Sequence, residues 1–183
     1  MGADVYNEIS RADILRRLER LEDERDVREA VNRYSMLTDH GTDEEWLDIW
    51  TENGTIDLVL AESFSNRALS ATHGGVACED GIRFSGREAL VGFRSGRHTA
   101  AKLRPNRETK HMHVQVVCEV DDDAAMAESY MIAMAWEDGE ILIYALGRTH
   151  DTLVRCADGR WRFVQRHTAT AGAKIREKIG RDV

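Results

Sequence analysis

The chain has 183 residues, a formal net charge of −8, 42% hydrophobic residues and 32% charged residues, which is typical of a globular protein with one hydrophobic core. The acidic balance argues against nucleic acid as the main partner, because phosphate binding needs a basic face. No apolar run approaches the length of a membrane span, the first residues lack the apolar core of a secretory signal, and the three cysteines form no C-x-x-C pair. We therefore predict a single domain over residues 1–183, located in the cytoplasm, with no nucleic-acid or membrane partner.

Signals for helices come first along the chain. Ser10 followed by Asp13 resembles a capping box, and an apolar stripe at helical spacing continues to Gly41. The polar stretch EDERD at 22–26 interrupts this stripe, so we expect a bend or two separate helices there. A second short helix is predicted from Thr42 to about Trp50, and a third in REALVGF at 87–93.

Strand patterns dominate the remainder. Asn53-Gly54 predicts a turn, and two long loops are predicted at 61–81 and 95–108, where they could act as lids or substrate walls. Helices followed by a meander of long strands indicate an α+β fold, with N-terminal helices packed on one face of a strongly curved, mostly antiparallel sheet. The strands are predicted at 55–60, 81–86, 109–120, 124–136, 141–156 and 160–170, followed by a tail at 171–183.

The stretch ETKHMHVQVV at 108–117 places two histidines one residue apart. On a strand, alternate side chains share a face, so Thr109, His111, His113 and Gln115 are predicted to point one way. Met112, Val114 and Val116 are predicted to point the other way. Two imidazoles and an amide on one face suit metal ligation, acid/base chemistry or polar decoration of an exposed sheet.

Five segments in this order resemble the SnoaL-like branch of the nuclear transport factor 2 superfamily, over about residues 11–170. They are RLEDERDVREAVNRYSMLTDHG, WLDIWTENGTIDL, FSGREALVGF, ETKHMHVQVV and GRTHDTLVRCADGRWRFVQR. The resemblance implies a cone in which a curved sheet wraps around helices and leaves a deep pocket. Its enzymes include scytalone dehydratase, hexachlorocyclohexane dehydrochlorinase and bile-acid dehydratases, which use no cofactor. Other members are non-catalytic dioxygenase β-subunits, and dimers or trimers are common.

The resemblance also implies roles for particular residues. His111 stands where the dehydratases have a pocket histidine, Asp39 where an aspartate pairs with it, and Tyr34 where a tyrosine faces the pocket. Arg155 lies near a substrate-contacting arginine of the family. The chain departs from the family pattern at three positions, which are His113, Gln115 and His150.

These residues suggest acid/base catalysis. A histidine titrates near neutral pH and can accept and return a proton, and an aspartate on its far nitrogen fixes the tautomer. We predict that Asp39 orients His111 as the base, with Tyr34 and His113 as polar partners. The apolar wall of the pocket is expected to come from Trp46, Trp50, Phe84, Tyr130 and Met131. The predicted substrate contacts are Trp50, Gln115, Tyr130, Arg155 and His150.

The predicted activity is that of a cofactor-free lyase, or an isomerase, acting on a cyclic or aromatic hydroxylated molecule by dehydration or by carbon–carbon cleavage that releases a small aldehyde. The protein is expected to be a homo-oligomer. One alternative is a non-catalytic scaffold resembling dioxygenase β-subunits. A second is a metal enzyme using His111 and His113, with Glu119, His150 or His167 completing the site.

Each residue also has a plainer interpretation. A strand histidine is often structural, Asp39 can face water at a helix end, and Tyr34 continues the apolar stripe of its helix. The tryptophans and Met131 are equally suited to the core, and Arg155 to a solvated surface.

Overall fold

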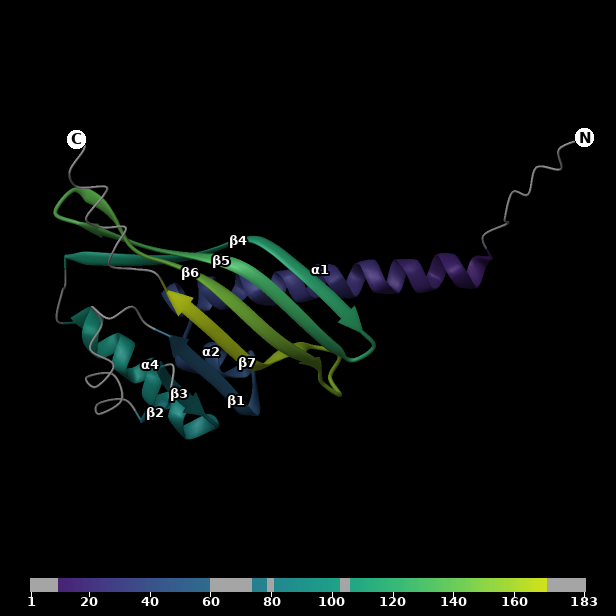
Figure 1. Cartoon of the computed structure of the whole chain (residues 1–183), viewed down its shortest axis with the longest axis horizontal. Helices are drawn as coiled ribbons and strands as arrows, with labels where there is room; N and C mark the ends of the chain where they lie inside the picture. Colours follow the sequence, from purple (N-terminus) through teal and green to yellow (C-terminus); the bar gives the residue numbers. More distant parts are fainter. Residues whose placement is uncertain (1–9, 60–73, 79–80, 103–105, 171–183) are drawn as a thin grey trace, which may run out of the picture.

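The computed structural model describes residues 10–59, 74–78, 81–102 and 106–170. Helices come first and long strands last, so the predicted α+β class is confirmed (Figure 1). The described elements are α1 (Arg11–His40), α2 (Asp43–Asp48), β1 (Trp50–Val59), β2 (Val76–Cys78), β3 (Gly81–Ser85), α4 (Arg87–Lys102), β4 (Arg107–Asp121), β5 (Ala124–Glu137), β6 (Glu140–Arg155) and β7 (Trp161–Thr170).

The described strands form one seven-stranded sheet in the order β2-β3-β1-β7-β6-β5-β4. All neighbouring pairs are antiparallel except β1 and β7, which run parallel. The sheet is strongly curved, and α1 runs along it, packing mainly on β4, while α2 and α4 lie near β1 and β3 (Figure 1). The space for a site therefore lies between these helices and the inner face of the sheet.

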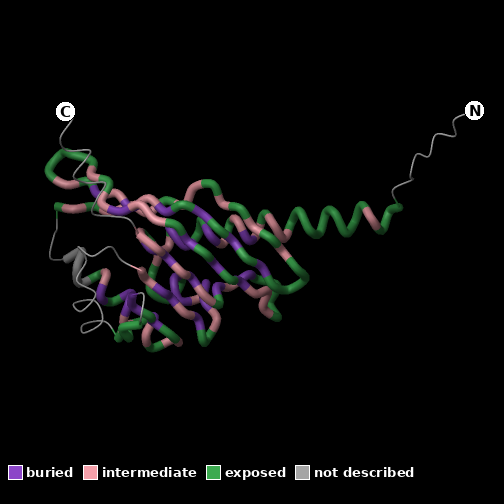
Figure 2. Tube along the Cα trace, in the orientation of Figure 1, coloured by how far each residue is buried: buried purple, intermediate pink, exposed green. Residues whose placement is uncertain are grey.

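Helix α1 is continuous over 30 residues, so the expected bend at 22–26 is wrong. Glu24, in the middle of the polar stretch, accepts hydrogen bonds from Arg20 and Arg28, one turn before and after it. Such pairs support a helix locally, and no glycine or proline interrupts it. The capping box at Ser10 and Asp13 forms as predicted. The first half of α1 extends beyond the sheet and is largely exposed (Figures 1 and 2).

Two further boundaries differ from the sequence prediction. Residues 50–59 form one strand rather than a turn at Asn53-Gly54. Gly54 is buried, and a Cβ at this position would lie 3.0 Å from the Trp50 ring, so close packing explains this glycine. Helix α4 continues to Lys102, across most of the predicted loop 95–108, because the one proline lies beyond it at 105. The predicted loop 61–81 falls largely outside the described residues, but it contains β2.

Register shifts interrupt the regular pairing of the sheet at four places, one between Trp50 and Thr55 of β1 and the others in β4, β6 and β7. In β4, Gln115 and Val116 together oppose one residue of β5, and Gln115 has a φ of 54°. In β6, Tyr144 is the extra residue between the partners of Ala133 and Met134. In β7, Val164 is the extra residue between the partners of Thr152 and Leu153. Such β-bulges re-aim side chains and often lie beside active sites.

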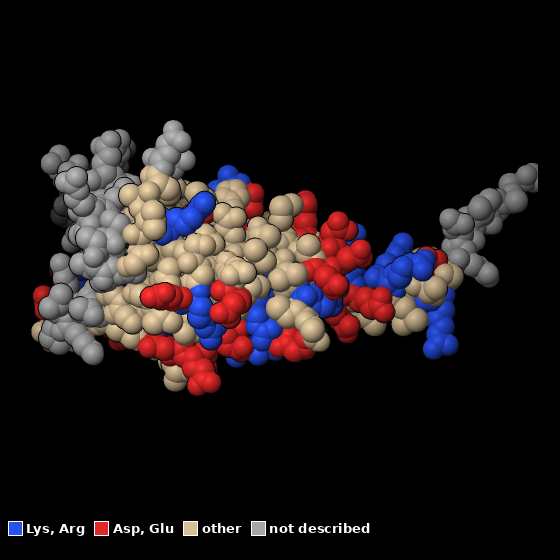
Figure 3. All heavy atoms as spheres, turned by 90° about the horizontal axis from the view of Figure 1, so that it is seen from below, with Lys and Arg blue, Asp and Glu red and all other residues tan. Residues whose placement is uncertain are grey.

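The core lies between the helices and the inner face of the sheet. Trp46, Trp50, Phe84, Phe93 and Phe163 pack against one another there. None of the described helices is both long enough and apolar enough to cross a membrane. On the face shown in Figure 3, basic and acidic side chains are interleaved along the projecting end of α1 rather than gathered by sign.

Candidate active site

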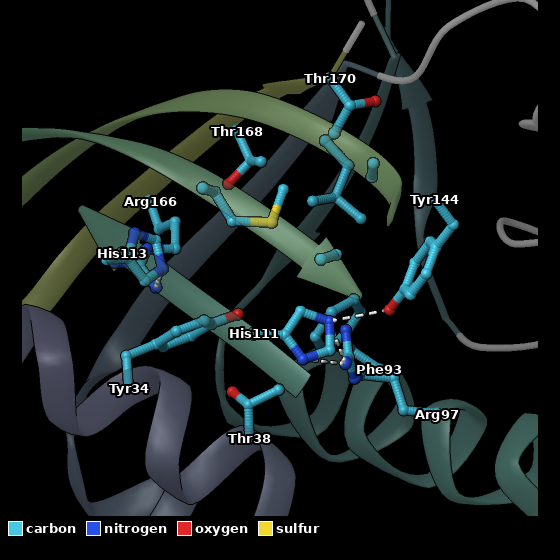
Figure 4. Close-up of a pocket in the computed structure, with 14 residues that line it drawn as sticks. Tyr34, Thr38, Phe93, Arg97, His111, His113, Tyr144, Arg166, Thr168 and Thr170 are labelled. Atoms are coloured by element: carbon cyan, nitrogen blue, oxygen red, sulfur yellow. Dashed lines mark hydrogen bonds between the residues drawn. The ribbon is translucent and has the colours of Figure 1, made fainter. Parts of the chain in front are cut away.

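A cavity of about 190 Å³ lies between α1, α4 and the inner face of the sheet (Figure 4). One wall is apolar and comes from β1, α4, β5 and β6, while polar groups come from α1, α4, β4, β6 and β7. The lining residues are Tyr34, Thr38, Leu58, Phe93, Arg97, His111, His113, Met131, Ala133, Tyr144, Ala145, Arg166, Thr168 and Thr170.

Asp39 and His111 form a buried pair at the cavity wall. The His111 Nδ1 lies 2.6 Å from the Asp39 Oδ1, and the His111 backbone N–H donates to Oδ2 at 2.7 Å. The side chains are 5% and 9% exposed, respectively. Because a carboxylate only accepts hydrogen bonds, the proton of a neutral imidazole belongs on Nδ1. The lone pair of Nε2 then faces the cavity side.

Two donors surround that Nε2. The Arg97 Nη2 lies 3.0 Å from it, and the Tyr144 hydroxyl lies 3.3 Å away (Figure 4). Burial lowers the pKa of His111 below its ordinary value, and the Arg97 charge lowers it further, while Asp39 opposes both effects. His111 is therefore neutral at neutral pH and has a lone pair available for a proton.

His113 is also neutral, but both of its nitrogens are occupied. Its Nδ1 lies 2.8 Å from the Ser129 hydroxyl, which contacts the Thr149 hydroxyl at 2.7 Å, and the Arg166 Nη1 lies 3.3 Å from Nε2. Since Arg166 only donates, Nε2 accepts and Nδ1 donates. Burial and the Arg166 charge lower the pKa of His113 to about 2. An imidazolium acid at this position is therefore disfavoured.

Arg166 links the two sides of the cavity. Its guanidinium forms a bidentate pair with Asp151 at 2.7 and 2.6 Å, and both side chains are almost completely buried. Its Cζ lies 3.6 Å from the centre of the Tyr34 ring. This stacking fixes the ring of Tyr34, whose hydroxyl points along the cavity toward His111 (Figure 4).

The structure brings together Asp39, His111, Tyr34 and His113 around one cavity. It places none of the five predicted substrate contacts there. Trp50 is 2% exposed and packs in the core. Gln115 occupies the bulge of β4 and is exposed, so the alternation that orients His111 and His113 ends before it.

The other three side chains point away from the cavity. Tyr130 is 55% exposed, because its neighbours Ser129 and Met131 take the inner face of β5. His150 is exposed on the outer face and lies near Glu128. Arg155 pairs with Asp23 of α1 and with Asp123, at the far end of β6.

The expected apolar wall is also only partly correct. Met131 lines the cavity, whereas Trp46 and Phe84 are fully buried in the core and Tyr130 is on the outer face. Phe93 supplies the aromatic surface of the cavity instead.

Sequence reasoning missed six polar side chains of the cavity, and three of them, Arg97, Tyr144 and Arg166, contact the two histidines. Arg97 falls in a segment predicted as a loop, although its position four residues after Phe93 is a helical signal that places both on one face. Tyr144 sits at the bulge of β6, and Arg166 follows the bulge of β7, where the alternation is out of phase with the start of the strand. The bulges explain why the side chains of Tyr144 and Arg166 point into the cavity, and the positions of these bulges are not visible in a single sequence.

The described residues contain no group of three or more histidine, cysteine, aspartate or glutamate side chains that could hold a metal ion. His150 and His167 lie together, with ring centres 6.4 Å apart, but neither lines the cavity that holds His111 and His113. Glu119 is exposed on β4. The expected third ligand of a metal site is therefore not brought to the histidine pair.

Known structures share this fold at low sequence identity. An NTF2-like protein with a cystatin-like fold from Novosphingobium aromaticivorans has a TM-score of 0.69 at 23% identity, covering 97% of this chain and 98% of that one. A protein from Catenulispora acidiphila in complex with S-DNPA has a TM-score of 0.58 at 21% identity, with coverages of 82% and 92%. ActVI-ORFA from Streptomyces coelicolor has a TM-score of 0.59 at 18% identity, with coverages of 82% and 97%.

Sequence comparison agrees with the fold. The anthranilate 1,2-dioxygenase small subunit of Burkholderia cepacia is 27% identical over 130 residues, which cover 70% of this chain and 74% of that protein. The SnoaL-like domain matches residues 19–167, a span that includes every side chain of the Asp39–His111 and Arg166–Asp151 pairs. The chain therefore belongs to the SnoaL-like family, which includes polyketide cyclases and dehydratases.

Proposed function

We propose that the protein is a cofactor-free lyase, or an isomerase, in which His111 removes a proton from a cyclic or aromatic hydroxylated substrate. The observation that carries this proposal is the buried hydrogen bond between Asp39 and His111 at the wall of an open cavity. Asp39 holds the imidazole in the tautomer with an unprotonated Nε2 and would stabilise the imidazolium that forms.

A dehydration can be written with this one base. Nε2 takes a proton from the carbon next to a carbonyl, and the C–H electron pair becomes the new carbon–carbon double bond as the β-hydroxyl leaves. The imidazolium returns the same proton to the leaving hydroxyl, so that water departs and His111 is neutral again. Tyr34, whose hydroxyl points toward His111, would hydrogen-bond the leaving oxygen. His113 then acts as a neutral support for Arg166 rather than as the acid.

The cavity favours a small, ring-sized substrate. Its volume of about 190 Å³ is below the ~300–1,000 Å³ of sites for drug-sized ligands. Leu58, Phe93, Met131, Ala133 and Ala145 line it with apolar surface, which suits a carbocycle. A retro-aldol cleavage that releases a small aldehyde would use the same base on a hydroxyl proton instead of a carbon proton.

The test is His111→Ala, assayed against a panel of hydroxylated cyclic and aromatic ketones by the absorbance of the conjugated product. Activity should fall by at least ~10²-fold, the usual contribution of a positioned acid/base group. His150→Ala is the matched control, because it removes a histidine from the outer face of the same sheet. A near-normal rate in His111→Ala would exclude His111 as the base.

A second candidate function is favoured by the likeness to a dioxygenase small subunit. In that case the chain would be a non-catalytic subunit, and its outer sheet face would bind a larger partner. This face exposes Met112, Met126, Tyr130, Trp136 and Ile141, and large apolar patches often mark interfaces. The same patch supports a homo-oligomer, dimer or trimer, formed by the lyase.

Purification of the chain alone separates these two candidates. A stable homo-oligomer that turns over a member of the panel supports the lyase. A chain that is inactive alone, and that forms a stoichiometric complex with the large subunit of an aromatic-ring dioxygenase, supports the scaffold.

A further inference from the structure

Arg97 occupies an unusual position for a cation, in direct contact with the imidazole of the proposed base. The Arg97 Nη2 lies 3.0 Å from Nε2 and 3.5 Å from Nδ1 of His111. The guanidinium reaches this site from α4, over the ring of Phe93, with 5.8 Å between the Cζ and the ring centre (Figure 4). Tyr144 approaches the same Nε2 from β6.

This arrangement conflicts with catalysis by a free base. A guanidinium beside a basic nitrogen opposes its protonation, and the Arg97 charge does lower the pKa of His111. The Tyr144 hydroxyl also lies 3.3 Å from the Nε2 that must take the substrate proton. Protonation of His111 is therefore disfavoured until something more attractive than an imidazole draws Arg97 away.

The other cation of the cavity is already neutralised. Both oxygens of Asp151 accept from Arg166, and the two side chains are 0% and 1% exposed. Among the described lining residues, Arg97 is the guanidinium that has no carboxylate paired with it. A guanidinium binds an anionic oxygen more strongly than a neutral nitrogen, because the hydrogen bonds are charge-assisted.

We propose that Arg97 and Tyr144 bind an anionic oxygen of the substrate, and that this binding moves Arg97 off His111 and frees the base. The inference rests on the proposed function and adds the substrate class, which is a ring that carries a negatively charged oxygen beside the carbon that loses its proton. The oxygen is either a carboxylate or an acidic enol that binds as its enolate, so that in both cases the negative charge is present before His111 removes the proton.

Charge balance is consistent with this assignment. Once His111 is protonated, Asp39, His111 and Arg97 together carry one net positive charge, because two cations face one carboxylate. An anionic oxygen on the substrate restores neutrality in a buried site, where an unbalanced charge is costly. The Tyr144 hydroxyl supplies a further donor to the same oxygen. Because both donors contact Nε2, the bound oxygen lies next to the base.

The test measures binding by calorimetry at pH 7.5, with benzoate, the nearly isosteric neutral benzamide, and 4-nitrophenolate as probes. Wild-type protein should bind benzoate or 4-nitrophenolate roughly 10- to 100-fold more tightly than benzamide, the range for hydrogen bonds to a charged group. Arg97→Gln should lose this preference. Arg148→Gln, which removes an equal charge from the outer face, should keep it. Preference for benzoate indicates the carboxylate, and preference for 4-nitrophenolate alone indicates the enolate.

A second measurement follows His111 itself by ¹⁵N NMR of the imidazole. Binding of the preferred anion should raise the titration midpoint of His111 in wild-type protein. In Arg97→Gln the midpoint should already be high without a probe and should not respond to it. A benzoate and 4-nitrophenolate affinity no greater than that of benzamide, or a preference that survives Arg97→Gln, would overturn the inference.

These readouts separate the inference from the proposed function. Binding needs no turnover, so His111→Ala should keep the anion preference even if no lyase substrate is ever found. Conversely, a lyase that acts on neutral rings, and that turns them over at the wild-type rate in Arg97→Gln, would retain the proposed function and eliminate the anion site.

Discussion

The stability of this protein should fall sharply between pH 7 and pH 5, and His113 should be a main cause. The folded protein holds the pKa of His113 at about 2, against an ordinary value of 6.5 in the unfolded chain, chiefly through burial and then through Arg166. Below pH 6.5 the unfolded chain therefore binds a proton here that the folded protein does not. The stabilising contribution is present above that pH and is lost as the pH falls.

The magnitude follows from the two pKa values. By linkage, protonation of His113 in the unfolded chain should lower the free energy of unfolding by about 2 kcal/mol at pH 5, and by only about 0.2 kcal/mol at pH 7. The value at pH 5 hardly depends on the folded pKa, provided that it lies below about 4. His111, whose pKa is also lowered by burial, should add to the same slope.

Urea unfolding at half-unit pH steps measures this slope. In His113→Gln the amide can still accept from Arg166 and donate to Ser129, so the fold should be kept while the titration is removed. Between pH 7 and pH 5, the free energy of unfolding of this variant should decline by about 2 kcal/mol less than that of the wild-type protein. His150→Gln, at a half-exposed histidine of the outer face, should decline as wild type does. A wild-type slope in His113→Gln would refute the assignment of His113 as a buried neutral group.

Two other perturbations follow from the buried pairs. Asp39→Asn presents an amide NH₂ to one of two donors, the Nδ1–H or the backbone N–H of His111. Turnover should fall roughly 10²- to 10⁴-fold, and ¹⁵N NMR of the imidazole should show a changed tautomer. An unchanged rate would remove Asp39 from the mechanism. Asp151→Asn leaves the buried Arg166 guanidinium without its carboxylate, so thermal unfolding should report a loss of about 3–5 kcal/mol. The exposed Glu128→Gln, which breaks the pair with Arg148, should cost less than ~1 kcal/mol, and equal losses in these last two variants would contradict the burial argument.

The parts of the fold that sequence could predict are those encoded by neighbouring residues. Both N-terminal capping boxes form, at Ser10 with Asp13 and at Thr42 with Glu45. Each involves side chains three residues apart, so no tertiary information is needed. The continuity of α1 was missed because a polar stretch looks like a break. It is sustained by ion pairs one turn apart, and the apolar residues of its first half, Ile14, Leu18 and Leu21, are exposed where the helix leaves the sheet.

The pairing of Asp39 with His111 joins residues 72 positions apart. Spacing alone could not have predicted it, and family resemblance was the source of that expectation. Alternation correctly grouped His111 with His113, because both precede the bulge of β4. It failed at Gln115 and Val116, where the extra residue exchanges the two faces. Val116 and Cys118 then pack against the core, although in a regular strand these even-numbered residues would face away from the side of His111 and His113.

The bulges that make the predicted alternation of side chains wrong also bring the polar residues to the cavity. In β4 the inner face belongs to odd positions at His111 and His113, and to even positions from Val116 onward. In β6 the extra residue is Tyr144, and in β7 the inner face passes from Phe163 to Arg166. Regular strands would leave Tyr144 or its inward neighbour Ala145 outside, and would give Phe163 and Arg166 opposite faces. In β4 and β7, one end of the strand can thus serve the apolar core while the other end presents polar groups to the pocket. With uninterrupted alternation, each of these two strands could turn either its core residues or its polar pocket residues inward, but not both.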